Sequence, residues 1–150
     1  MSVIWFDYML PCLCAFLACM GFILVFNIHG VGKLICGVGG ALGWLVYLLA
    51  GRTIFAAFLA SAAIGVFSEV MARLRRCPVT GYLLVALLPL VPGGGIYYAM
   101  SYCVSGDIQQ FLATLLHTFG MAAALAVGAM MASSLFRTAY LHLYQRQSSR

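Results

Sequence analysis

The chain has 150 residues, of which 65% are hydrophobic and only 7% are charged. An average soluble domain is about 45–50% apolar and about 25% charged, so the composition excludes an ordinary soluble enzyme and a disordered chain. The net charge of +5 comes from scattered basic residues that form no continuous patch, which excludes a classical nucleic-acid binder.

Uncharged stretches divide the chain into predicted membrane spans. A helix needs roughly 20 apolar residues to cross about 30 Å of hydrocarbon, and charged residues mark where such spans end. The second uncharged stretch, 34–51, is short but strongly apolar. The third, 53–68, is long enough to cross only if its helix continues through Glu69 towards Arg73. We expect one all-α integral membrane domain with five transmembrane helices. The predicted spans lie near 8–28, 34–51, 53–73, 79–104 and 111–136, followed by a basic tail at 137–150.

A four-span alternative merges 34–51 with the loops, and the basic residues test the two counts. With five spans, seven basic residues share one side, and only Arg52 lies on the other, with Asp7 and Asp107. Without the second span, Lys33 changes sides and the bias weakens. Because basic residues favour the cytoplasmic side, we expect five spans, with the N-terminus outside and the C-terminus in the cytoplasm.

Small residues recur every fourth position in two of the spans. Inside a bilayer such residues let helix backbones approach closely, so these stripes predict a tight bundle and an oligomer. The first stripe is Ala57, Ser61, Gly65, Glu69 and Arg73, and the second is Gly120, Ala124, Gly128 and Ala132.

Few ionisable residues lie within the spans. Glu69 and Arg73 are one helical turn apart and can form an ion pair. They are candidates for a substrate or proton site, or for a charge pair at the cytoplasmic interface. His117, in the last span, is a candidate proton relay or a hydrogen-bonded packing residue. Asp107 suits a helix N-cap.

The fourth stretch contains a break in its predicted helix. Pro89 and Pro92 are followed by Gly93, Gly94 and Gly95 near the middle of a 30-residue uncharged run, and such a sequence does not continue a regular helix. Broken backbone at that depth is tolerated where protein or a wet cavity satisfies it, and it forms substrate sites in many transporters.

We expect a half-helix that begins after Gly95 and directs its free N–H groups at a substrate carboxylate. Tyr97 and Tyr98 would flank that point with hydroxyl donors. The alternative is that the segment is an ordinary turn outside the membrane. The substrate-binding prediction comprises Glu69, Arg73, Pro89, Pro92, Gly93, Gly94, Gly95, Tyr97 and Tyr98.

No sequence motif supports an enzyme, a nucleotide site or a metal site. Five of the six cysteines lie in apolar runs and no CxxC pair occurs, so we interpret them as packing residues. No cofactor is expected.

Several short motifs occur in an order that resembles the threonine/serine exporter (ThrE) family, in particular its C-terminal domain. The most specific is Pro89-Leu90-Val91-Pro92-Gly93, which follows Ser68-Glu69 and Ala72-Arg73. The others are Phe26-Asn27, Gly43-Trp44-Leu45-Val46-Tyr47, Ile64-Gly65, Pro78 with Thr80, Tyr97-Tyr98-Ala99-Met100 and Gly106-Asp107. The resemblance covers about residues 20–137.

This resemblance implies a small YjjB-like subunit of an inner-membrane exporter. Its substrates would be threonine- or serine-type amino acids, or dicarboxylates such as succinate. A larger YjjP-type membrane subunit is implied as the partner, because the family's N-terminal domain is absent from the sequence. The alternative function is a membrane scaffold or assembly subunit that does not transport.

Overall fold

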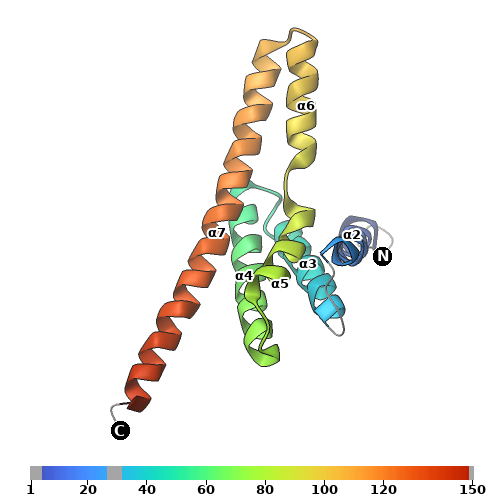
Figure 1. The fold of residues 1–150 in the computed structure, drawn as a ribbon. Coiled ribbons are helices and arrows are strands. Elements are labelled where there is room, and N and C mark those ends of the chain that lie inside the picture. The colour runs from blue at the N-terminus through green and yellow to red at the C-terminus, as the bar shows by residue number, and fades with distance from the viewer. Residues whose placement is uncertain (1–4, 27–31, 149–150) are drawn as a thin grey trace.

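A computed structural model describes residues 5–26 and 32–148, and within these residues the chain is helical with no strand. A π-helical turn and a 3-10 turn accompany six α-helices (Figure 1). In chain order the elements are η1 (Trp5–Met9), α2 (Leu10–Val25), α3 (Gly32–Leu49), α4 (Ile54–Arg75), α5 (Val79–Leu87), η2 (Leu88–Leu90), α6 (Gly93–Val104) and α7 (Ile108–Ser148).

Four unbroken segments of the described chain are long and apolar enough to cross a membrane, at 7–25, 32–49, 54–75 and 108–136. The segments 79–90 and 93–104 qualify only as a pair, bent by 44°. The predicted all-α membrane fold is therefore confirmed, with four candidate spans among the described residues, or five if the bent pair forms one interrupted span. The short second stretch forms a regular helix, α3. The basic tail predicted at 137–150 is not separate from the last span, since α7 continues as one helix to Ser148.

Side-chain caps and left-handed residues explain where several helices begin and end. The Thr53 hydroxyl accepts a hydrogen bond from the Ala56 N–H at 3.1 Å at the start of α4. The Asp107 carboxylate accepts one from the Gln110 N–H at 3.1 Å at the start of α7, as predicted. Arg76 ends α4 in the left-handed conformation, with φ of 54°.

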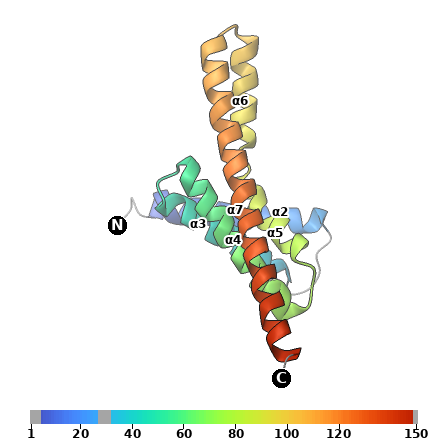
Figure 2. The ribbon, with the colours of Figure 1, turned by 90° about the vertical axis from the view of Figure 1, so that its left-hand side faces the viewer.

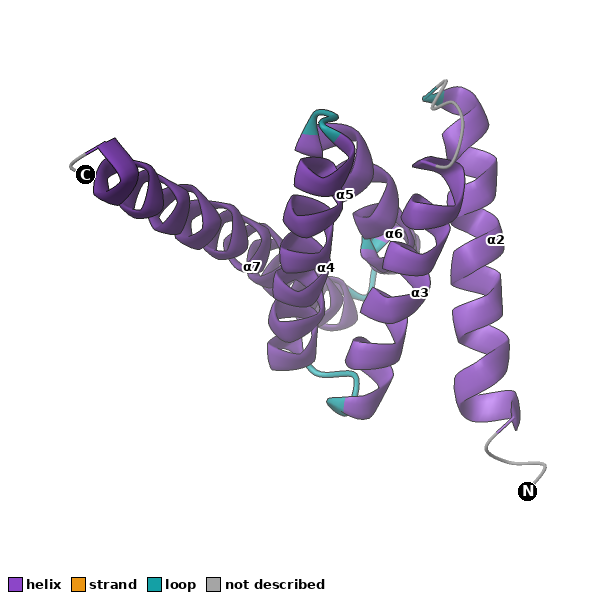
Figure 3. Cartoon of the chain, turned by 90° about the horizontal axis from the view of Figure 1, so that it is seen from below, coloured by secondary structure: helices purple, strands orange, loops and turns teal. Residues whose placement is uncertain are grey.

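Helices α2 to α5 form a bundle, which Figure 3 shows from below. α3 lies between α2 and α4, and α5 packs against α3 and α4. The bundle has an Arg52 end, at the α3–α4 connection, and an Arg75 end, at the α4–α5 connection. Buried apolar side chains form two clusters, and the second includes Leu125 of α7 (Ile108–Ser148). Cys19, Ile23, Cys36, Ala72, Tyr82 and Val85 form the first, and Ala57, Ala60, Ile64, Ala86, Leu90 and Leu125 form the second.

The two predicted stripes of small residues pack against each other, and they join α4 to α7. A Cβ atom on Gly65 would lie 2.5 Å from the Cβ of Ala132, and one on Gly128 would meet Ser61 and the carbonyl of Phe58. Both helices run in the same direction along this seam. Side chains at these glycines would push the helices apart.

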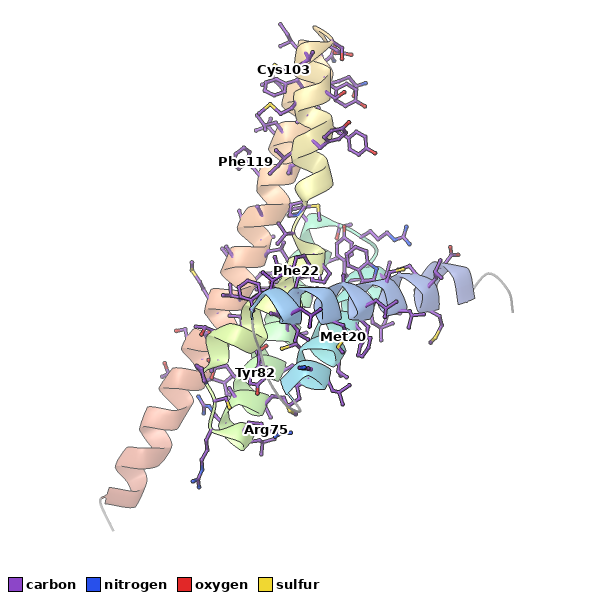
Figure 4. The ribbon with its side chains drawn as sticks, turned by 45° about the vertical axis from the view of Figure 1, so that its right-hand side comes forward. Met20, Phe22, Arg75, Tyr82, Cys103 and Phe119 are labelled. Atoms are coloured by element: carbon purple, nitrogen blue, oxygen red, sulfur yellow. The ribbon has the colours of Figure 1, made fainter. Side chains whose placement is uncertain are left out.

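Helices α6 and α7 form an arm that extends beyond the bundle (Figures 1 and 2). α6 packs chiefly against α7. At 1.5 Å per residue, the 41 residues of α7 extend about 60 Å. In Figure 4, α2 lies crosswise to the arm, and the labelled Cys103 and Phe119 lie on the arm far from Met20 and Tyr82 in the bundle.

Candidate functional site

The interrupted span is built from two prolines and a 3-10 turn. α5 ends at Leu87, η2 covers Leu88–Leu90, and α6 begins at Gly93. The expectation that Gly93, Gly94 and Gly95 lie in the break and that the half-helix starts after Gly95 is therefore wrong. The prolines interrupt the helix because they lack N–H groups. The glycines are poor helix formers, but they are tolerated in the first turn of α6.

The backbone groups released by the break are largely satisfied within the protein. Pro89 cannot donate to the carbonyl of Val85, and the thiol of Cys19 on α2 donates to that oxygen instead, at a sulfur–oxygen distance of 3.4 Å. The Val91 N–H donates to the Leu88 carbonyl at 3.2 Å. The Gly93 N–H donates to the Val91 carbonyl at 2.8 Å. Cys19 thus has a specific role in addition to packing.

The break faces a hollow between α2 and α3. This hollow has a volume of about 370 Å³ and is lined by Pro11, Cys14, Ala15, Ala18, Trp44 and Pro89. The indole N–H of Trp44 is buried and has no hydrogen-bond partner among the described residues. An unpaired buried donor is costly, so Trp44 adds one unsatisfied polar group beside an otherwise apolar hollow.

The first turn of α6 presents open backbone on one side and a tight contact on the other. A Cβ atom on Gly93 or Gly94 would have nothing within 4 Å, whereas one on Gly95 would meet the side chain of Thr118 on α7. The first N–H groups of any helix lack partners within that helix. The exposed side of this turn therefore combines free N–H groups with the positive end of the helix dipole.

Tyr97 and Tyr98 point outward from α6, with 71% and 59% of their surfaces exposed. Their rings pack edge to face with centroids 5.6 Å apart. They lie one turn beyond the glycines, and their exposure leaves their hydroxyl groups available to a partner or to solvent.

Glu69 and Arg73 form the predicted ion pair, and the pair also links two helices. The guanidinium of Arg73 donates to the Glu69 carboxylate at 3.4 Å and to the backbone carbonyl of Phe136 on α7 at 3.3 Å. It also lies 5.3 Å from the centre of the Phe136 ring. Glu69 is buried. These contacts join α4 to α7 near the Arg75 end.

The predicted site residues fall into separate groups. Leu90, within the break, packs beside Ala57 and Ala60, and Glu69 lies roughly 14 Å further along α4 than Ala60. His117 is exposed on α7. The break and the first turn of α6 form one candidate site, and the ion pair is a second, distant feature.

Sequence reasoning missed the contributions of Cys19 and Trp44. A proline in an apolar span signals that one carbonyl needs a donor, but the sequence cannot indicate which helix supplies it. The described residues contain no group of three His, Cys, Asp or Glu side chains that could hold a metal ion.

Residues 11–135 match the model of the family described as "Threonine/Serine exporter, ThrE". The matched region contains the α2–α5 bundle, the break, α6 and most of the apolar part of α7. No curated protein and no solved structure matches the chain.

Proposed function

Because the chain belongs to the threonine/serine exporter family, a family of membrane transporters, we propose that it is one subunit of an exporter for small carboxylate-bearing metabolites. The proposed substrates are threonine- or serine-type amino acids, or dicarboxylates such as succinate. The observation that carries this proposal is the family match over residues 11–135. The broken span within that region supports it, since such breaks form substrate sites in other transporters.

The first turn of α6 is the proposed contact for the substrate carboxylate. Gly93 and Gly94 leave the backbone uncovered, so an anionic group can approach the first N–H groups of the helix. The helix dipole favours negative charge at this point. The 44° bend directs this turn away from the axis of α5.

A partner subunit is proposed to cover the arm. α6 has one flank on α7, while Ile96, Tyr97, Tyr98 and Met100 are exposed. A larger YjjP-type subunit that packs against this flank would enclose the open side of the first turn. The sequence has no nucleotide-binding motif, so we propose that an ion gradient or the substrate gradient drives export. The proposed location is the inner membrane, with the N-terminus outside and the C-terminus in the cytoplasm.

Efflux from loaded cells tests this function. Cells that express this chain, the larger subunit, or both would be loaded with labelled serine, threonine or succinate. We expect the pair to release at least one substrate faster than either subunit alone. If the two subunits assemble in the membrane and release none of the substrates faster, the exporter proposal is wrong and the scaffold alternative gains support.

A further inference from the structure

A second hollow lies at the Arg52 end of the bundle, apart from the break. It has a volume of about 320 Å³ and is lined by Asp7, Tyr8, Leu48, Gly51 and Arg52. Pockets that bind small molecules measure about 300–1,000 Å³. Its lining therefore combines an acid from η1 with a base from the α3–α4 connection.

Asp7 and Arg52 are not paired with each other. The described residues contain one ion pair, between Arg73 and Glu69, and neither the Asp7 carboxylate nor the Arg52 guanidinium has a hydrogen-bond partner among them. Opposite charges beside one hollow, each without a protein partner, suit a ligand that itself carries both charges.

The backbone of Arg52 is held in an unusual conformation. Its φ angle of 57° lies in the left-handed region, which residues other than glycine rarely adopt. The Arg52 N–H donates to the Tyr47 carbonyl at 3.2 Å, and the Tyr47 hydroxyl donates to the Arg52 carbonyl at 3.3 Å. Strained residues held by several contacts occur at functional sites, and here the contacts fix the base of the arginine beside the hollow.

We propose that the Asp7–Arg52 hollow binds the zwitterionic head group of a small α-amino acid. The Arg52 guanidinium would bind the α-carboxylate, a pairing that planar guanidinium groups favour. The Asp7 carboxylate would accept hydrogen bonds from the α-ammonium group. A dicarboxylate such as succinate offers no ammonium group and would bring a second negative charge towards Asp7. The inference rests on the proposed export function and narrows its substrate class to amino acids.

Residues that line the two hollows neighbour one another in the sequence of η1–α2 and of α3. Pro11 lies one turn after Asp7, and Trp44 lies one turn before Leu48, so both follow the same helix faces. Pro11 and Trp44 line the second hollow together with Pro89. The two hollows therefore draw on neighbouring turns of the same segments, one at the Arg52 end and the other beside Pro89.

Ligand binding to the purified full chain tests the site without requiring transport. A ligand that binds only the folded protein raises its unfolding temperature. We expect L-serine and L-threonine to raise the unfolding temperature of the wild-type chain in detergent, and succinate to raise it less. Arg52→Gln and Asp7→Asn should each weaken amino-acid binding about tenfold, since each removes a charge-assisted hydrogen bond.

Two matched variants control for charge and conformation. Arg76→Gln alters the other arginine with positive φ, which lies at the opposite end of α4. Asp107→Asn alters an exposed acid outside the hollow and retains a good N-cap residue. Both should bind L-serine as the wild type does. A conservative Arg52→Lys variant should retain part of the affinity, because it keeps the charge and loses the planar geometry.

Unchanged L-serine binding in both Arg52→Gln and Asp7→Asn would overturn the inference, and so would absence of L-serine binding to the wild-type chain. The efflux assay separates this failure from that of the proposed function. If serine binding depends on Asp7 and Arg52 but the two assembled subunits export nothing, the site is supported and the proposed export function is wrong. If the two subunits export substrate but serine binding does not depend on Asp7 and Arg52, the export function is supported and the proposed site is wrong.

Discussion

Helices α4 and α7 have nearly the same hydropathy and very different surroundings. Their most apolar windows have mean hydropathies of 1.9 and 1.8, yet 44% of the α4 window is buried within the protein and only 17% of the α7 window. Hydropathy thus identifies both as membrane helices and does not separate them. α4 packs against α3, α5 and α7, whereas α6 and α7 expose many large apolar side chains.

Polar contacts follow the same division. In the bundle, the Cys19 thiol satisfies the carbonyl released by Pro89, and Arg73 pairs with Glu69 while it also contacts α7. In the arm, the first turn of α6 leaves its open side uncovered at Gly93 and Gly94. The α4–α7 seam is therefore expected to contribute most to stability, and the arm carries the proposed carboxylate contact at the first turn of α6 and the proposed partner surface.

The largest expected effect is at the α4–α7 seam. Gly128→Leu would drive a side chain into Ser61 and to within 2.5 Å of the Phe58 carbonyl. Because backbone cannot yield as a flexible side chain can, we expect a loss of about 3 kcal/mol in the free energy of unfolding. Thermal unfolding of the purified protein in detergent measures this loss.

Gly21→Leu is the matched control, since a Cβ atom on Gly21 has nothing within 4 Å. We expect it to leave the unfolding temperature nearly unchanged. Equal stability of the two variants would show that α4 and α7 do not depend on close approach, and the proposed division between bundle and arm would lose its basis.

The ion pair should give the next largest effect. Arg73→Leu leaves the buried Glu69 carboxylate without this partner and removes the bond to the Phe136 carbonyl. Arg73 is 40% exposed, so we expect a loss of about 2 kcal/mol in the free energy of unfolding, less than for a fully buried pair.

Glu69→Gln should cost less, about 1 kcal/mol, because the amide can still accept a hydrogen bond. A double-mutant cycle between the two positions measures their coupling. If Glu69→Gln abolishes efflux while stability changes little, the carboxylate has a role in transport beyond its pairing with Arg73.

A smaller effect distinguishes two buried cysteines. Cys19→Ala and Cys36→Ala remove the same volume from the same cluster, but only Cys19 donates to the Val85 carbonyl. We expect Cys19→Ala to be more destabilising by about 0.5–1 kcal/mol, with Cys19→Ser retaining part of the difference. Chemical unfolding of the two variants compares them, and equal losses would show that the thiol acts by packing alone.

Much of the fold could be predicted from the sequence because lipid imposes strong rules. Gaps between charged residues predicted the helical segments, and Pro89 with Pro92 predicted the interruption. The two small-residue stripes were evident from their spacing. The sequence did not indicate that they pack against each other, since a stripe shows that close approach is possible and not which helix approaches.

The candidate site was predicted less completely, because the sequence does not show which helices lie side by side. Its residues were placed together because they share a short sequence or a polar character, yet Glu69 lies far along α4 from the break and His117 faces outward. The predicted starting point of α6, after Gly95, was wrong because it relied on the low helix propensity of glycine. The cost of three glycines in one turn is small enough for neighbouring structure to override it.

The smallest expected change in stability, and the sharpest test of the arm, is at Gly94. Gly94→Leu places a side chain in open space on the first turn of α6, and replacing glycine in a helix stabilises it by up to about 1 kcal/mol. We therefore expect an unfolding temperature equal to or slightly above that of the wild type. Efflux by the assembled pair should fall sharply, because leucine would cover the N–H groups proposed to meet the substrate carboxylate. Gly94→Ala should retain more efflux, since its methyl group covers less of the turn. Normal efflux by Gly94→Leu would show that substrate passes elsewhere, and the arm would then be a surface for the partner alone.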